Sequence, residues 1–481
     1  MSDIKKTVMT NWRWVMCAML FFATTVNYMD RQVLSLTFKE FIQPEFHWTD
    51  SDYGTITGVF SIAYAIFCLF AGKFIDWMGT KKGYLWAIVI WSLGAVMHAG
   101  CGFVTEHIVG LESKQALLEA SGAIVSSISM VSVWLFLACR LILGLGEAGN
   151  FPAAIKVTAE YFPKKDRAFA TALFNAGASV GALAAPATIP LLAKSLGWEW
   201  AFIIIGALGF IWAGIWIFVY DKPTESKHVN ASELAYINSD EEQSDKVQGT
   251  KEEKQMSFIE AFKHKQTWSF AFGKFMTDGV WWFFLFWAPA YFQDQYGIKA
   301  SDPQGIALIF TLYAIVTVIS LFGGYLPKIF VEKKGMEPYA GRMRAMLIFA
   351  FFPLLALFAQ PLGGVYGPWA VAIIIGIVGA AHQSWSANIF STTGDMFPKS
   401  AVATITGIGA MAGGVGSFLI NKGSGMLFDH AAGLGDAFQF MGFSGKPAGY
   451  MIIFCICAVA YLIGWSVMKI LVPKHEPVVL K

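Results

Sequence analysis

The stretch EWAFIIIGALGFIWAGIWIFVY at residues 199–220 contains a single charged side chain, Glu199. About 20 such residues in a helix are enough to cross the hydrocarbon core of a bilayer. The whole chain has the same character, because 56% of its 481 residues are hydrophobic and only 14% are charged. A soluble domain carries about 25% charged residues. This composition excludes soluble enzymes, disulfide-rich secreted scaffolds, disordered chains and nucleic-acid-binding proteins, and it predicts an integral membrane protein.

Eleven other apolar runs accompany this one and predict an all-α membrane protein with twelve transmembrane helices. The first set lies near residues 14–36, 53–75, 83–104, 130–152, 168–193 and 199–220, and the second near 268–293, 305–328, 343–361, 366–390, 401–428 and 449–472. Basic residues precede the first run as in a signal peptide, but no cleavage pattern follows it, so we expect a retained helix.

An internal repeat relates the two sets of runs. An offset of 235 residues places Phe162-Pro163-Lys164 on Phe397-Pro398-Lys399 and Val180-Gly181 on Val415-Gly416. The long hydrophilic stretch 221–267 separates the halves. We therefore expect two pseudo-symmetric six-helix bundles, at 1–220 and 268–481, joined by a linker at 221–267.

The basic residues at the ends of the runs predict the orientation in the membrane. One side collects the larger share, namely Lys5, Lys6, Arg13, Lys81, Lys82, Lys164, Lys165, Arg167, Lys333, Lys334, Arg342, Arg344, Lys399 and Lys474. Both termini and the linker are therefore expected in the cytoplasm, with the protein in the inner membrane. The formal net charge of +2 adds no signal toward a charged partner.

Six ionisable residues lie deep inside the predicted helices. They are Asp30 and Arg31 in the first, Arg140 and Glu147 in the fourth, and Lys274 and Asp278 in the seventh. Each costs several kcal/mol in a membrane unless it is paired or hydrated. Arg140 and Glu147 are two helical turns apart on one face, and Lys274 and Asp278 have the i, i+4 spacing of a direct pair. The set predicts an aqueous cavity, although structural ion pairs that lock helices together would also account for it.

The chemistry of these groups favours an anionic substrate. Arginine presents a planar fork that matches a carboxylate, and lysine adds a point charge, so Arg31 and Lys274 are candidates for holding it. A carboxyl group in a cavity of low dielectric takes up a proton more readily than in water, which makes Asp30 and Glu147 candidates for proton coupling. An interior-negative potential opposes entry of a monovalent anion by about 2.3 kcal/mol per 100 mV, and co-transport of a proton removes that penalty.

Aromatic and hydrogen-bonding side chains complete the candidate set. Tyr28, Tyr64, Trp281, Trp282 and Trp385 are able to stack on a sugar ring, and Asn175, His382, Gln383, Ser384 and Ser386 are able to bond its hydroxyls. Singly, each of these residue types is more often a packing residue of a membrane helix. The cluster AHQSWSAN at 381–388 is polar in the middle of an otherwise apolar run, and this favours a cavity role.

Several motifs together resemble the major facilitator superfamily. Gly72, Asp76, Gly79 and Lys81 fit its loop pattern G-x-x-x-D-x-x-G-x-[RK], and 324–328 forms a degenerate second copy. The segments NYMDRQ at 27–32, RLILGLGEAGNFPAAIK at 140–156, GKFMTDGVWW at 273–282 and AHQSW at 381–385 resemble its anion:cation symporter branch, and hexuronate transporters most closely.

The resemblance implies roles for individual residues. Asp30 and Glu147 match the acids that carry protons, and Arg140 matches the basic partner of the second acid. Arg31, Tyr28 and Tyr64 match the group that holds the substrate carboxylate, whereas Trp385 matches an aromatic beside the sugar. The loop motif Gly72, Asp76, Gly79 and Lys81 is expected to gate the cytoplasmic side.

These observations predict a monomeric, proton-coupled symporter that imports a hexuronate such as glucuronate or galacturonate by alternating access. The proton gradient is the expected energy source, with no metal or other cofactor. Another organic anion (an aldonate, tartrate, phthalate or a sugar phosphate) fits the same electrostatics. A membrane enzyme would need a nucleophile–base pair or metal ligands, which the sequence does not suggest, and a nutrient sensor would carry a longer signalling tail than 473–481. The sequence does not explain the insertions at 105–125 and 431–447 or the charge of Lys422.

Overall fold

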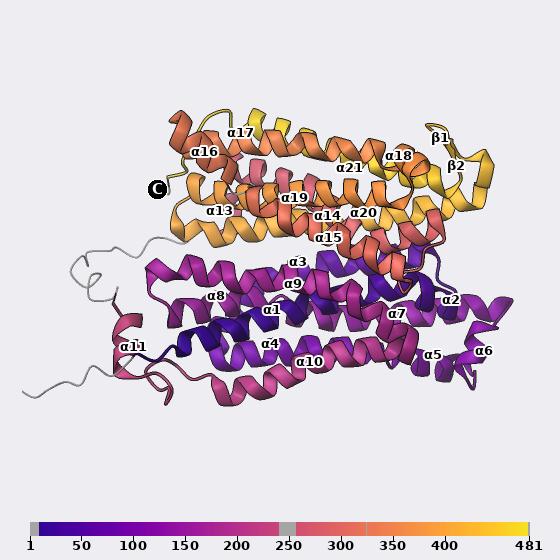
Figure 1. The fold of residues 1–481 in the computed structure, drawn as a ribbon, viewed down its shortest axis with the longest axis horizontal. Helices are drawn as coiled ribbons and strands as arrows, with labels where there is room; N and C mark the ends of the chain where they lie inside the picture. Colours follow the sequence, from indigo (N-terminus) through magenta and orange to yellow (C-terminus); the bar gives the residue numbers. More distant parts are fainter. Residues whose placement is uncertain (1–8, 240–255, 324, 480–481) are drawn as a thin grey trace, which may run out of the picture.

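The computed structural model describes residues 9–239, 256–323 and 325–479, and these are almost entirely helical. Figure 1 shows long helices running roughly parallel, with those of the first half of the chain lying beside those of the second. Lys5 and Lys6, the centre of the expected linker and the first residue of the degenerate loop motif lie outside the described residues.

The first half of the chain forms ten α-helices and a π-helical turn within the described residues. They are α1 (Trp12–Thr37), the π-helical η1 (Phe38–Ile42), α2 (Gln43–Phe46), α3 (Asp50–Met78), α4 (Thr80–His98), α5 (Cys101–Val109), α6 (Lys114–Leu118), α7 (Ala123–Glu147), α8 (Asn150–Tyr161), α9 (Lys164–Leu196) and α10 (Trp198–Val219). The short α11 (Ala231–Ile237) follows, and its Glu233 holds the start of α1 through an ion pair with Arg13 at 3.0 Å.

The second half repeats this plan. Its elements are α13 (Phe258–Ala261), α14 (Lys265–Tyr296), α15 (Pro303–Gly323), α16 (Tyr325–Lys334), α17 (Pro338–Phe351), the 3₁₀ turn η3 (Phe352–Phe358), α18 (Ala359–Tyr366), α19 (Pro368–Met396), α20 (Lys399–Leu434), η4 (Gly435–Ala437), the paired strands β1 (Gln439–Phe440) and β2 (Phe443–Ser444), and α21 (Lys446–Leu471). The insertion at 431–447 thus forms the end of α20, a turn and a two-stranded hairpin.

Within the described residues, nine helical segments are long and apolar enough to cross a membrane, or ten if the pair α4–α5 counts as one span bent by 50°. Helices α1 and α14 are equally long but less apolar, because they contain the buried charges that the sequence singled out. The predicted total of twelve spans therefore stays a prediction, while the all-helical membrane fold is confirmed.

Small residues allow the helices to approach closely. An added Cβ at Gly177 of α9 would overlap the carbonyl oxygen of Phe21 in α1, and one at Gly181 would overlap that of Thr25. Helix pairs in membranes pack at such stripes because short side chains let the backbones meet. This seam fixes α1, which carries Asp30 and Arg31, against α9.

The two ends of the bundle differ. At one end lie α11, α13 and the C-terminus, and we call it the terminal end (left in Figure 1). At the other end lie α2, α6 and the β1–β2 hairpin, and we call it the far end (right in Figure 1).

Candidate functional site

A buried ion pair between α1 and α7 is the centre of the site. The Nη2 and Nε atoms of Arg31 donate to Oε2 of Glu147 at 2.7 and 3.0 Å. Both residues are almost fully buried, at 6% and 1% exposed. The other carboxylate oxygen, Oε1 of Glu147, has no hydrogen-bond partner among the described residues. A buried charge survives only when a counter-charge compensates its lost hydration, so each group depends on the other.

Three aromatic rings surround the Arg31 guanidinium. Its carbon Cζ lies 4.6 Å from the ring centre of Tyr64 and 5.3 Å from those of Tyr28 and Trp282. Such cation–π contacts stabilise a desolvated cation by about 2 kcal/mol. Tyr28 and Tyr64 come from the first half and Trp282 from the second, so the cage spans both bundles.

A cavity of about 360 Å³ lies beside this cage, between the two bundles. Its walls come from both halves of the chain: Ser61, Tyr64, Ala65, Cys68, Ala148, Phe151 and Pro152 from the first, and Lys274, Asp278, Trp282, Phe390, Thr406, Ala410 and Gly414 from the second. Tyr64 and Trp282 belong to both the cage and the wall. The volume is within the range that holds a small organic molecule.

A second ion pair lies in the wall of the cavity. Lys274 Nζ lies 2.7 Å from Asp278 Oδ2 on α14, as the i, i+4 spacing predicts, and 4.2 Å from the ring centre of Phe390. The Lys274–Asp278 pair thus lies in the cavity wall itself. Arg31 and Glu147 lie outside the lining, and Arg31 adjoins it through its contacts with Tyr64 and Trp282. The convergence of Arg31, Glu147 and Lys274 on one shared cavity stays a prediction.

Arg140 lies on the same helix as Glu147 but is not its ion-pair partner in this structure. Glu147 forms its ion pair with Arg31 instead. The Arg140 guanidinium lies 5.3 Å from the ring centre of Phe60. None of its three nitrogens, and neither carboxyl oxygen of Asp30, has a hydrogen-bond partner among the described residues. Arg140 and Asp30 are each only 2% exposed. Buried polar groups without partners are rare in folded proteins and concentrate where water, protons or ligands act.

The polar cluster of α19 is not part of the cavity wall. His382 is stacked on Trp281, with ring centres 5.4 Å apart, and its Nδ1 lies 2.7 Å from the Tyr461 hydroxyl. Trp385 is completely buried and packs edge-on against Tyr461. Gln383 and Asn175 also lie outside the lining, although Asn175 is exposed on α9. In this conformation none of these four residues lines the cavity, and His382 and Trp385 pack against residues of their own bundle instead.

The far end is closed by a ring of four charged side chains. Lys39 Nζ lies 3.2 Å from Asp50 and 3.0 Å from Asp294, and Lys446 contacts the same two carboxylates, at 2.6 Å for Asp294. Lys39 and Asp50 belong to the first half, whereas Asp294 and Lys446 belong to the second. Each lysine therefore bridges the bundles, and the hairpin insertion positions Lys446 at the start of α21.

Two further contacts join α20 to the first turn of α3. The Asp429 carboxylate accepts from the backbone N–H groups of Asp50 and Ser51 at 2.9 and 2.7 Å, as a helix cap supplied by the other bundle. Lys422, which the sequence left without an account, donates to the hydroxyls of Ser51 and Thr55 at 2.8 and 2.7 Å. Among the described residues, every ion pair between the halves lies at the far end.

The loop motif after α3 lies at the terminal end. Asp76 pairs with Lys156 of α8 at 2.7 Å, and Lys81 pairs with Asp221 at 2.8 Å. Gly79 has φ 77°, a left-handed conformation that suits glycine. An added Cβ at Gly72 would meet nothing within 4 Å. These contacts stay within the first half and its linker, so in this conformation the motif braces one bundle at its terminal end.

The sequence did not single out several residues of the site. Phe390 and Phe151 line the cavity, and the far-end ring depends on Lys39 and Asp294, which lie near helix ends where charges are ordinary. Phe151 follows Glu147 by one helical turn, a spacing that places it toward the same side.

Fold and site together define a many-helix membrane protein with a charged, aromatic-lined cavity between two bundles. Residues 20–420 match the Major Facilitator Superfamily, and the chain belongs to this family. It is therefore a transporter rather than an enzyme, as the sequence predicted.

The relatives are carriers of small solutes. The chain is 28% identical to the hexuronate transporter of Escherichia coli (strain K12) over 463 residues, which are 95% of this chain and 94% of the relative. It is 23% identical to the probable galactarate/D-glucarate transporter GarP of the same organism, over 95% of this chain and 96% of the relative. Among solved structures, the D-xylose-proton symporter superposes with a TM-score of 0.66 at 15% identity, over 97% of this chain and 98% of that chain, which shows the shared fold.

Proposed function

We propose that this protein is a proton-coupled symporter that imports a hexuronate across the bacterial inner membrane, with both termini in the cytoplasm. The observation that carries the proposal is the Arg31–Glu147 pair inside an aromatic cage beside the cavity between the bundles. The similarity to a hexuronate transporter over almost the whole chain supports the substrate class.

The ion pair couples substrate to proton by competition for one guanidinium. When Glu147 is ionised, it holds Arg31 and neutralises its charge. When Glu147 takes up a proton, the attraction falls and Arg31 is free to bind a substrate carboxylate, for which a guanidinium fork is well shaped. The substrate and the proton therefore bind together. A monovalent anion that moves with one proton carries no net charge, so the membrane potential does not oppose it.

Alternating access follows from the asymmetry of the two ends. The four-residue ring closes the far end. The residues that line the cavity, for example Cys68 of α3 and Phe390 of α19, lie between the middle of their helices and the terminal end. With the termini in the cytoplasm, this is the conformation that faces inward. Opening of the far end requires the ring to break.

Asp30 and Arg140 supply a second group for proton handling. Their buried polar atoms lack hydrogen-bond partners among the described residues, so the charge state of this pair is free to respond to events at Glu147, seven residues after Arg140 on α7.

A dicarboxylate sugar acid is the second candidate substrate. Lys274 lies in the cavity wall and Arg31 contacts the lining residues Tyr64 and Trp282. A sugar with a carboxylate at each end would therefore have two cations to bind. The similarity to a galactarate/D-glucarate transporter supports this alternative. Competition of unlabelled glucuronate, galacturonate and galactarate for uptake separates the two.

Uptake into proteoliposomes under an imposed pH gradient tests the coupling. Radiolabelled glucuronate should accumulate with the native protein, R31A should abolish uptake, and E147Q should retain exchange across the membrane but lose accumulation. The control K299A, which changes an exposed lysine 4.0 Å from Glu40, should behave as the native protein. Normal accumulation by E147Q would show that Glu147 does not carry the proton.

A further inference from the structure

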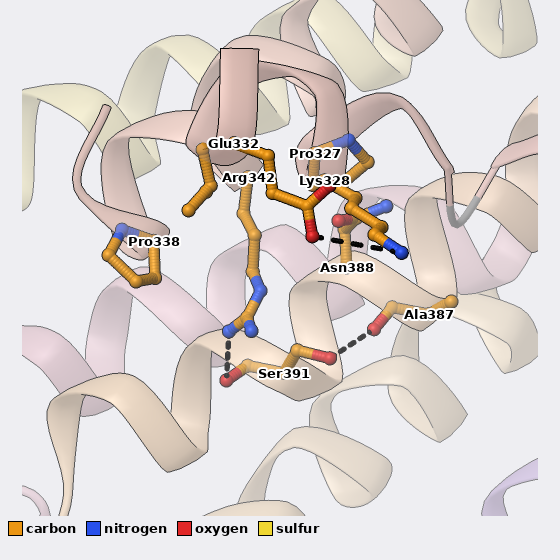
Figure 2. Close-up of a pocket in the computed structure, with 9 residues that line it drawn as sticks. Pro327, Lys328, Glu332, Pro338, Arg342, Ala387, Asn388 and Ser391 are labelled. Atoms are coloured by element: carbon orange, nitrogen blue, oxygen red, sulfur yellow. Dashed lines mark hydrogen bonds and ion pairs between the residues drawn. The ribbon is translucent and has the colours of Figure 1, made fainter. Parts of the chain in front are cut away.

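A second pocket lies apart from the cavity, near the terminal end of the second half. It has a volume of about 360 Å³ and lies between α16, α17 and α19. Figure 2 shows the side chains of Lys328 and Arg342 extending into it, with Asn388 and Ser391 along α19. Lys328 and Glu332 are more than half exposed, so the pocket opens to the surface of the bundle.

The pseudo-symmetry of the chain shows what is unusual about this pocket. In the first half, the corresponding position holds the ion pair between Asp76 and Lys156. The offset of 235 residues places Ser391 where Lys156 stands, and the degenerate loop motif places Lys328 where Asp76 stands. A lysine thus replaces the acid, and a serine replaces its basic partner. The pair that closes the first-half position is therefore absent here, and a positive charge faces the pocket.

Lys328 and Arg342 each already have a carboxylate partner, Glu332 and Asp395 respectively, but both cations keep further donors. Lys328 lies 3.7 Å from Glu332, but both side chains are more than half exposed, and such pairs contribute little. Arg342 uses Nη1 for Asp395 and for the Ser391 carbonyl at 3.2 Å, which leaves its Nε and Nη2 as donors. Lys333 and Lys334 on α16 and Arg344 on α17 are exposed nearby. None of these three cations lines the pocket.

We propose that this pocket binds a phosphate group, held by the ammonium of Lys328 and the free N–H groups of Arg342. A guanidinium binds two phosphate oxygens at once and a lysine adds a point charge, which is the donor set present here. Basic pockets between transmembrane helices bind phospholipid headgroups. On the same helix as Lys328, Tyr325 is 62% and Ile329 is 38% exposed, which supplies apolar surface for an acyl chain. The phosphate is carried by an anionic phospholipid or by a soluble phosphate, and the experiment distinguishes the two.

Delipidated protein in detergent tests the proposal by thermal unfolding and native mass spectrometry. Titration with phosphatidylglycerol should raise the unfolding temperature by several degrees and show a retained lipid, whereas phosphatidylcholine, whose headgroup has no net charge, should do so at least fivefold more weakly. K328E should weaken phosphatidylglycerol binding at least tenfold. The matched control K334E, on the same helix but outside the lining, should change it less than threefold.

The other arms of the titration identify the source of the phosphate. If inorganic phosphate or glycerol phosphate stabilises the native protein but not K328E, the pocket binds a soluble phosphate. Equal binding of phosphatidylglycerol by the native protein, K328E and K334E, together with no effect of soluble phosphate, would overturn the proposal. Because the readout is binding, it does not depend on the identity of the transported substrate.

Discussion

Removal of Lys446 should shift the protein toward a conformation with the far end open. The Lys446 ammonium contacts Asp294 of its own bundle and Asp50 of the other, and only the second contact is lost when the bundles part at this end. The K446A variant therefore removes one of the two lysine bridges within the four-residue ring and leaves that of Lys39 to Asp294.

The magnitude follows from the burial of the pair. Two unit charges about 4 Å apart attract by about 4 kcal/mol at an effective dielectric of 20. The Lys446 and Asp50 side chains are 17% and 5% exposed, so part of this attraction is offset by the cost of desolvation. Asp50 also keeps Lys39 as a partner at 3.2 Å. We expect a net effect of about 2 kcal/mol, which is about a 30-fold change in the equilibrium between closed and open.

Spin-label distance measurements across the far end provide the assay. Labels on cysteines introduced at Glu112 and Gln304, which are exposed at the far ends of the two halves, report their separation in a background without native cysteines. K446A should populate a longer distance that is minor in the unaltered background. The control K299A loses only a 4.0 Å contact of a half-exposed lysine and should shift the equilibrium by less than about 0.5 kcal/mol. Identical distance distributions for K446A and its parent would refute the ring as a latch.

Three other perturbations test the packing, the cavity and the C-terminal tail. G177A should lower the free energy of unfolding by about 1–3 kcal/mol, because the new methyl group would overlap the Phe21 carbonyl of α1. The control G214A has open space around the new methyl group and should not lower it. Thermal unfolding measures both variants. F390A should raise the KM for uptake about 2- to 5-fold, because Lys274 loses a cation–π contact worth about 0.5–1 kcal/mol. An unchanged KM would show that Phe390 does not contribute to substrate binding. The Asp395 carbonyl and the Glu337 carboxylate raise the pKa of His475 above its usual 6.5. Docking of the tail 472–479 should therefore be strongest below pH 6.5 and weaken as the pH rises through the raised pKa. Hydrogen exchange of the tail should show this pH dependence in the native protein but not in H475Q.

Sequence reasoning located the buried charges, while their roles in transport stay predictions. Asp30, Arg31, Glu147 and Lys274 were identifiable because a charge inside an apolar run must have a partner or water. The roles predicted for Trp385 and His382 also stay predictions. Neither residue lines the cavity in this conformation, and a Trp or His in a membrane helix satisfies packing and cavity roles equally well. Sequence reasoning did not predict that Glu147 pairs with Arg31 rather than with Arg140. Spacing relates Glu147 only to Arg140, which is on the same helix, whereas Arg31 is on α1 and is brought to the acid by the tertiary structure.

The chain by itself determines a helical membrane protein with an internal repeat and a few buried charges, because the lengths of apolar runs and the cost of a charge in hydrocarbon are local properties. Tertiary structure alone decides which charges meet. Lys446 and Asp50 are distant in sequence, yet they close the far end together, since folding of two bundles against each other brings their helix ends into contact. Which charged side chains form ion pairs depends on their positions in space, and the spacing of residues along one helix does not specify the positions of residues on other helices.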